Sequence, residues 1–254
     1  MLLQVLGSGA AFTSCGSNAS YCLDGRLLVD CGAPLHQILP RAGVDVHAPD
    51  VLLITHFHFD HVGQVPLLLG ARALMTSPTR PLTIGGPPGT VDYLMRLLHT
   101  GYGGHLLRII TERLEIRPLV LQDGSDVEVE GFRVRANAVV HSTGPSLSYA
   151  ITGADGSTAG FSGDSTLCAG LERTMAAADL MVLECTGWTQ PVESHLWGGE
   201  VLQLMERHPE VTVLLSHLME RGSLDGALVG HDLLALEVPR RGAPLPLAPA
   251  SLAG

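Results

Sequence analysis

Three histidines and one aspartate lie within six residues of the chain, in the stretch ITHFHFDHVG. This stretch follows the apolar run Val51–Ile54, which is typical of a buried strand. In an extended segment His56, His58 and Asp60 project to the same side, and His61 joins them if the chain turns into a helix there. Imidazole nitrogens and carboxylate oxygens are ligands of zinc and similar divalent ions. The spacing therefore predicts a metal site, in which the four side chains hold one ion fully or two ions in part.

Three further ligand-type residues each follow an apolar segment that is typical of a strand. They are His141 in NAVVHST, Asp164 in GFSGDST and His217 in VTVLLSHL. Gly163, directly before Asp164, allows the tight backbone turn that a ligand at this position needs. Sites in layered α/β folds collect where several strands end. We therefore expect these three residues to join the four of the dense motif.

Strand-like and helix-like segments follow one another in both halves of the chain, with no convincing linker between them. The pattern predicts strands at residues 2–6, 20–23, 26–30, 51–55, 81–84, 127–129, 132–140, 148–152, 159–162, 180–184, 211–216 and 233–238. It predicts helices at residues 34–42, 62–69, 90–99, 167–177 and 198–208. Two halves of this kind indicate two packed sheets with helices outside. We expect one domain over residues 1–254, with a loose Pro/Ala-rich tail at 240–254.

The charge of the chain limits the partners that it can bind. The 254 residues carry a formal net charge of −10, and all fifteen basic residues are arginine. An acidic chain without a basic cluster is poorly suited to gripping a long nucleic acid by its phosphates. A small phosphorylated substrate is still compatible, because a bound metal ion supplies local positive charge.

Cysteine usage and apolar runs indicate the compartment. The five cysteines are scattered and show no CxxC spacing, which is typical of a reduced protein. The segment MLLQVLGSGAAF has no basic region and is broken by glycines, so we expect no signal peptide. No apolar run approaches the roughly 20 residues that span a bilayer. We expect a cytoplasmic protein with no membrane partner.

The segments THFHFDH, VVHS, SGDS and LLSHL, in this order, resemble the metallo-β-lactamase superfamily of metal-dependent hydrolases, and LGSGAAF and LLVDCGAP are similar to its N-terminal segments. The resemblance implies an α/β fold, a four-layer αββα sandwich of the metallo-β-lactamase type. It also implies two divalent ions at one edge of the sandwich, zinc first and Mn²⁺ or Fe²⁺ as alternatives. By this resemblance one ion is held by His56, His58 and His141, the other by Asp60, His61 and His217, and Asp164 bridges them.

Two segments in the second half resemble ribonuclease Z more closely. VLECTGW looks like the HEAT segment of that family, and VESHLWGGE looks like its HST segment, although HLW departs from HST. The resemblance implies that Glu184 orients a protonated His195 toward the leaving oxygen, and we count Asp60 with these two as catalytic. The alternative is that Glu184 is a strand-end polar group and His195 a helix-start residue.

The leading hypothesis for the function is a phosphodiesterase that cleaves a small phosphodiester or a nucleotide-derived substrate through a metal-bridging hydroxide. The first alternative is hydrolysis of a carboxylic ester, thioester or lactone on the same metals. Ribonuclease Z-type 3′ processing of transfer RNA is less favoured. Ribonuclease Z carries a long RNA-clamping arm between its counterparts of His141 and Asp164, where this chain has only STGPSLSYAITGADGSTAGFSG.

Two readings from other classes complete the set of hypotheses. A flavodiiron-type oxidoreductase has a glutamate in the dense motif and a flavodoxin domain, and this sequence has neither. A non-catalytic metal-binding module is the other reading. The resemblance to ribonuclease Z also implies a homodimer.

We also expect roles for four residues near the ligand-type side chains. Asp30 in VDCG is expected to steady the histidine loop rather than bind metal. Phe57 and Phe59 are expected to pack beneath that loop. Arg221, just after His217, is the arginine that we expect to contact a phosphate.

Overall fold

The chain folds into two mixed β-sheets that pack face to face. The computed structural model describes residues 1–75 and 80–242. The first sheet has the order β14–β1–β2–β3–β4–β5–β6 and consists of β1 (Leu2–Gly7), β2 (Ser20–Leu23), β3 (Leu27–Val29), β4 (Val51–Leu53), β5 (Leu82–Gly86), β6 (Ile116–Val120) and β14 (Ala235–Glu237). The second sheet has the order β13–β12–β11–β10–β9–β8–β7 and consists of β7 (Asp126–Val129), β8 (Phe132–Val139), β9 (Ser146–Thr152), β10 (Thr158–Phe161), β11 (Leu180–Glu184), β12 (Thr212–Ser216) and β13 (Leu228–Val229).

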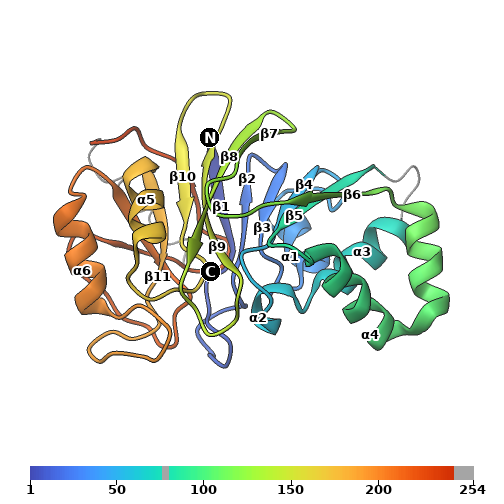
Figure 1. The fold of residues 1–254 in the computed structure, drawn as a ribbon, viewed down its shortest axis with the longest axis horizontal. Coiled ribbons are helices and arrows are strands. Elements are labelled where there is room, and N and C mark those ends of the chain that lie inside the picture. Colours follow the sequence, from blue (N-terminus) through green and yellow to red (C-terminus); the bar gives the residue numbers. More distant parts are fainter. Residues whose placement is uncertain (76–79, 243–254) are drawn as a thin grey trace.

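Helices cover the outer face of each sheet (Figure 1). The first sheet is covered by α1 (Leu35–Arg41), α3 (Val65–Leu74) and α4 (Thr90–Arg113), and the second by α5 (Ala169–Ala177) and α6 (Gly198–Arg207). The short helix α2 (Phe59–Val62) forms part of the dense histidine motif. These four layers confirm the predicted αββα sandwich of the α/β class.

The period-two alternation of strand side chains produces the layers. In β4, Val51 and Leu53 enter the core between the sheets, whereas Leu52 faces the helices. In β11, Val182 enters the same central core and Leu183 packs under α5 and α6. Because both faces of these strands are buried, their sequences are continuous apolar runs.

Two predicted helices have different bounds. The helix expected at 62–69 is instead α2 and α3, and the chain turns between them at Gly63. A Cβ atom at Gly63 would lie 2.5 Å from the carbonyl oxygen of Phe59, so this tight turn requires glycine. The helix expected at 90–99 continues to Arg113 and is interrupted at Gly103, where φ is 73°.

Two strands were not predicted. β6 contains Pro118 and lies at the edge of the first sheet, where a missing backbone donor is tolerated. β13 has only two residues, too few to form a pattern. Residues 240–242 of the predicted loose tail are described, and the rest of that tail lies outside the described residues. Among the helices of the described residues, none is both long and apolar enough to cross a membrane.

Candidate metal centre

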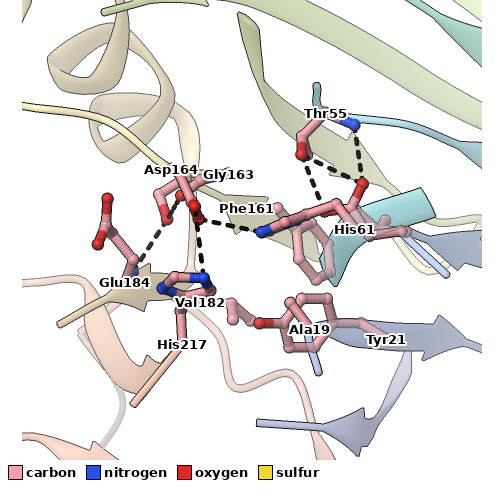
Figure 2. A pocket seen from close by; sticks show the side chains of 13 residues that line it. Ala19, Tyr21, Thr55, His61, Phe161, Gly163, Asp164, Val182, Glu184 and His217 are labelled. Carbon is pink, nitrogen blue, oxygen red and sulfur yellow. Dashed lines mark hydrogen bonds and ion pairs between the residues drawn. The ribbon is translucent and has the colours of Figure 1, made fainter. Parts of the chain in front are cut away.

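The ligand-type residues collect at one edge of the sandwich because several strands end there. β10, β11 and β12 are parallel to one another, and Asp164 and His217 follow two of them. β8 is antiparallel to β9, which is antiparallel to β10, so β8 ends at the same edge and delivers His141. The motif after β4 reaches this edge from the first sheet. Figure 2 shows His61, Asp164 and His217 converging there.

One group of possible ligands is formed by His56, His58, His141 and Asp164, whose ligand atoms all lie within 4.8 Å of one another. Nε2 of His56 lies 3.7 Å from Oδ2 of Asp164, and Nε2 of His141 lies 3.8 Å from the same oxygen. Nδ1 of His58 lies 2.9 Å from Nε2 of His141. Three nitrogens and a carboxylate oxygen thus face one small volume.

A second group is formed by Asp60, His61, Asp164 and His217, again within 4.8 Å. Nε2 of His61 lies 3.3 Å from Oδ1 of Asp164. Nε2 of His217 lies 3.3 Å from Oδ2 of Asp164 and 3.2 Å from Oδ2 of Asp60. Because Asp164 belongs to both groups, its two oxygens can serve two neighbouring ions.

Acceptors beneath the site orient two of the imidazole rings. Nδ1 of His61 lies 2.8 Å from Oδ2 of Asp30, the carboxylate expected to steady this loop. The Thr55 hydroxyl lies 2.9 Å from the same Asp30 oxygen and 3.0 Å from Nδ1 of His56. A hydroxyl that donates to Asp30 accepts from His56, so Nδ1 of each ring carries a proton and Nε2 of each ring is the atom that faces the site.

The donor set fits divalent metal ions. Nε2 of His56, Nε2 of His61 and Oδ1 of Asp164 are buried and have no hydrogen-bond partner among the described residues. Leaving three buried polar atoms without partners is costly, and metal coordination satisfies all three. Imidazole and carboxylate are also the ligand types of zinc, manganese and iron.

Burial and charge favour the metal-binding protonation states of His56 and Asp164. Burial holds the pKa of His56 well below its usual range, which favours the neutral ring that binds metal. Burial alone would raise the pKa of Asp164, but the charges of His217 and His61 outweigh it and hold that pKa well below its usual range.

Left-handed backbone conformations occur directly before Asp164 and at His217. Gly163 has φ 58°, and a Cβ atom there would lie 3.0 Å from both the Leu147 carbonyl oxygen and the Thr55 Cβ. His217 itself has φ 52°, an uncommon conformation for a residue with a side chain. Such strain is often found at functional sites.

Glu184 and His195 meet beside the two groups. Nδ1 of His195 lies 3.0 Å from Oε2 of Glu184, and Glu184 also accepts hydrogen bonds from the Ser165 amide and the Thr186 hydroxyl, both at 2.7 Å. Burial by itself would lower the pKa of His195, but the hydrogen bond with Glu184 raises it above its usual value.

Thr186 links this pair to the ligand groups. Its Oγ1 lies 2.9 Å from Nδ1 of His217 as well as 2.7 Å from Glu184. A hydroxyl that donates to Glu184 accepts from His217, so Nδ1 of His217 carries a proton and its Nε2 faces Asp60 and Asp164. Sequence reasoning missed Thr186, although its position two residues after Glu184 was a usable signal.

Two spaces adjoin the centre. A cavity of about 10 Å³, lined by Tyr21, Asp30 and Glu184 among others, lies between the sheets (Figure 2). This is about the space of a single water molecule. On the solvent side a cleft of about 580 Å³ is lined by His58, Asp60, Asp164, Thr186, His195 and His217 and by apolar side chains, and it is the space open to a substrate.

The predictions for Phe59 and Arg221 are wrong. Phe57 is partly buried and stacks on Tyr93, but Phe59 is 65% exposed and lines the cleft, because the turn of α2 directs it outward. Arg221 does not line the cleft. Its guanidinium donates to the carbonyl oxygens of Gly230 and Cys15 instead.

Comparison with known proteins gives consistent results. A family model described as "Beta-lactamase superfamily domain" matches residues 25–218. Ribonuclease Z of Methanosarcina acetivorans is 25% identical, and the alignment covers 94% of this chain and 98% of that protein. The alignment runs over 310 positions, more than the 254 residues of this chain, so that relative carries residues with no counterpart here.

Two solved structures share the fold. The short form of human tRNase Z has a TM-score of 0.74 at 20% identity, over 94% of this chain and all of that one. The metallo-β-lactamase fold protein YhfI of Bacillus subtilis also has a TM-score of 0.74, at 18% identity, over 92% of this chain and 98% of that one.

Proposed function

Since the chain belongs to the β-lactamase superfamily and is a metal-dependent hydrolase, we propose that it is a phosphodiesterase acting on a small phosphodiester. We further propose two zinc ions. One is held by His56, His58 and His141, the other by Asp60, His61 and His217, with Asp164 shared between them. When bound, the ions would polarise the phosphoryl oxygens and lower the pKa of a water molecule.

The observation that carries the phosphodiester proposal is the contact between His195 and Glu184 beside the ligand groups. The leaving group of an alkyl phosphodiester is a poor one, and it needs a proton as the bond to phosphorus breaks. Nδ1 of His195 bonds Glu184, which leaves Nε2 to donate that proton in the cleft. The raised pKa of His195 keeps the ring protonated over a wider pH range, as a general acid requires.

Transfer-RNA 3′ processing is the second candidate, because relatives named ribonuclease Z align over nearly the whole chain. Two observations favour a small substrate instead. The segment between His141 and Asp164 is a hairpin of β9 and β10, and it is too short to include a long arm as well. All fifteen arginines lie in the described part of the chain, and none lines the cleft.

A substrate panel tests these candidates on the zinc-loaded protein. The panel contains bis(p-nitrophenyl) phosphate, p-nitrophenyl acetate, a set of lactones and a precursor transfer RNA. We expect kcat/KM to be highest for the phosphodiester. If the protein prefers the acetate or a lactone, its function is carboxylic ester hydrolysis and the phosphodiesterase proposal is wrong. Correct 3′ cleavage of the precursor at a higher kcat/KM would establish the ribonuclease Z function.

A further inference from the structure

The cleft beside the metal centre carries exposed aromatic side chains. Phe12 is 95% exposed and Phe59 is 65% exposed, and both line the cleft. The other three phenylalanines of the chain are buried or partly buried, so both exposed phenylalanine rings lie at this one place. Met219, 44% exposed, lines the same cleft. Apolar surface gathered at a reactive site is typical of a surface that a ligand covers.

The charged groups of the cleft are almost all acidic. Glu193 lines it from the loop that carries His195, and Asp60 and Asp164 line its floor. The chain has no lysine, and Arg221, close in sequence to Met219, donates instead to backbone carbonyls outside the cleft. Positive charge therefore comes only from the bound ions and from a protonated His195. A phosphate next to the ions is neutralised, but a second phosphate farther along the cleft meets Glu193 and no cation.

We propose that the substrate is a phosphodiester with a single negative charge and an aromatic ester group that contacts Phe12 and Phe59. The proposal rests on the phosphodiesterase function and narrows it to one substrate class. Aromatic rings stack on one another without requiring a particular hydrogen-bond pattern, so the two phenylalanines select for a ring rather than for one compound. Glu193 disfavours substrates that carry a further phosphate near the scissile bond.

Two synthetic diesters test the aromatic contact. Phenyl p-nitrophenyl phosphate and methyl p-nitrophenyl phosphate have the same leaving group and the same charge. For the zinc-loaded wild type we expect kcat/KM to be about tenfold higher for the phenyl diester. The F12A/F59A double variant should lose this preference through KM. Tyr102→Ala removes an exposed aromatic ring outside the cleft and should keep the preference.

A second pair of substrates tests the charge. Thymidine 5′-(p-nitrophenyl phosphate) is compared with the same compound carrying a 3′-phosphate. We expect the added phosphate to lower kcat/KM, and Glu193→Arg to reduce that penalty. A phenyl preference that survives in F12A/F59A, or an added phosphate that raises kcat/KM, would overturn the proposal. If F12A/F59A keeps the wild-type KM but changes its oligomeric state, measured by light scattering, the Phe12 and Phe59 rings belong to a protein interface.

Binding measurements separate this proposal from the phosphodiesterase function. Calorimetry compares phenyl phosphate with methyl phosphate on the zinc-loaded wild type and on F12A/F59A. If no diester is hydrolysed but the wild type binds phenyl phosphate more tightly and the variant does not, the assigned reaction is wrong and the aromatic contact stands. If diesters are hydrolysed and both proteins bind the two phosphates equally, the aromatic contact is wrong and the phosphodiesterase function stands.

Discussion

Nδ1 of His195 lies 3.0 Å from Oε2 of Glu184, at the margin of seven side chains of ligand type. The carboxylate is buried and the imidazole is partly exposed to the cleft. This arrangement holds the ring in one orientation and leaves its other nitrogen facing the space open to a substrate. It makes His195 a candidate proton donor.

Replacing His195 with alanine should lower turnover while leaving the metal content intact. Loss of a general acid typically costs about 10²- to 10⁴-fold in rate. The loss should be large for an alkyl diester, whose leaving group needs the proton, and small for a p-nitrophenyl diester. Steady-state kinetics on both substrates, with metal analysis by mass spectrometry, measure this. His99→Ala, an exposed histidine that does not line the cleft, is the control. Equal losses on the two substrates would remove the proton-donor role.

Replacing Glu184 with glutamine should move the alkaline limb of the kcat profile to lower pH. His195 donates only when protonated, so activity falls as pH rises through its pKa, which the hydrogen bond with Glu184 raises. Glutamine removes the negative charge, the pKa of His195 falls, and activity is lost at a lower pH. Bound ions lower this pKa in both proteins, so the difference between the profiles is the informative quantity. An alkaline limb at the same pH in both would show that Glu184 does not act through His195.

Thr186→Val should weaken metal binding as well as turnover, because one hydroxyl contacts both Glu184 and His217. Loss of a group that orients a metal ligand typically costs about 10- to 100-fold in affinity or activity. Zinc competition with a chromophoric chelator measures the affinity. Thr186→Ser keeps the hydroxyl and should restore both properties. A valine variant with normal zinc affinity would confine Thr186 to a packing role.

The side chains of ligand type at this edge were predictable because strand ends impose a strong pattern. His141, Asp164 and His217 each follow an apolar strand, and strands that run in one direction end at one edge of a sheet. The walls of the cleft were not predictable. Phe59 alternates with residues of ligand type and was expected to be buried, but one turn of α2 directs it to solvent. Phe12 lies more than forty residues before the motif, and the strand order of the first sheet brings its loop to the cleft, because β1 runs parallel to β4 and ends at the same edge.

Removing the metals should destabilise the protein, because the centre gathers buried groups that have no other partner. Nε2 of His56, Nε2 of His61 and Oδ1 of Asp164 make no hydrogen bond within the described residues. At a free zinc concentration 100 times the dissociation constant, one site adds about 2.7 kcal/mol to the free energy of unfolding. Thermal unfolding before and after dialysis against EDTA should show a lower Tm for the apo protein, restored by zinc. Asp164→Asn, which weakens the shared ligand, should bind less zinc and gain less Tm on its addition. A Tm that chelation leaves unchanged, with no zinc in the untreated protein, would contradict the metal centre.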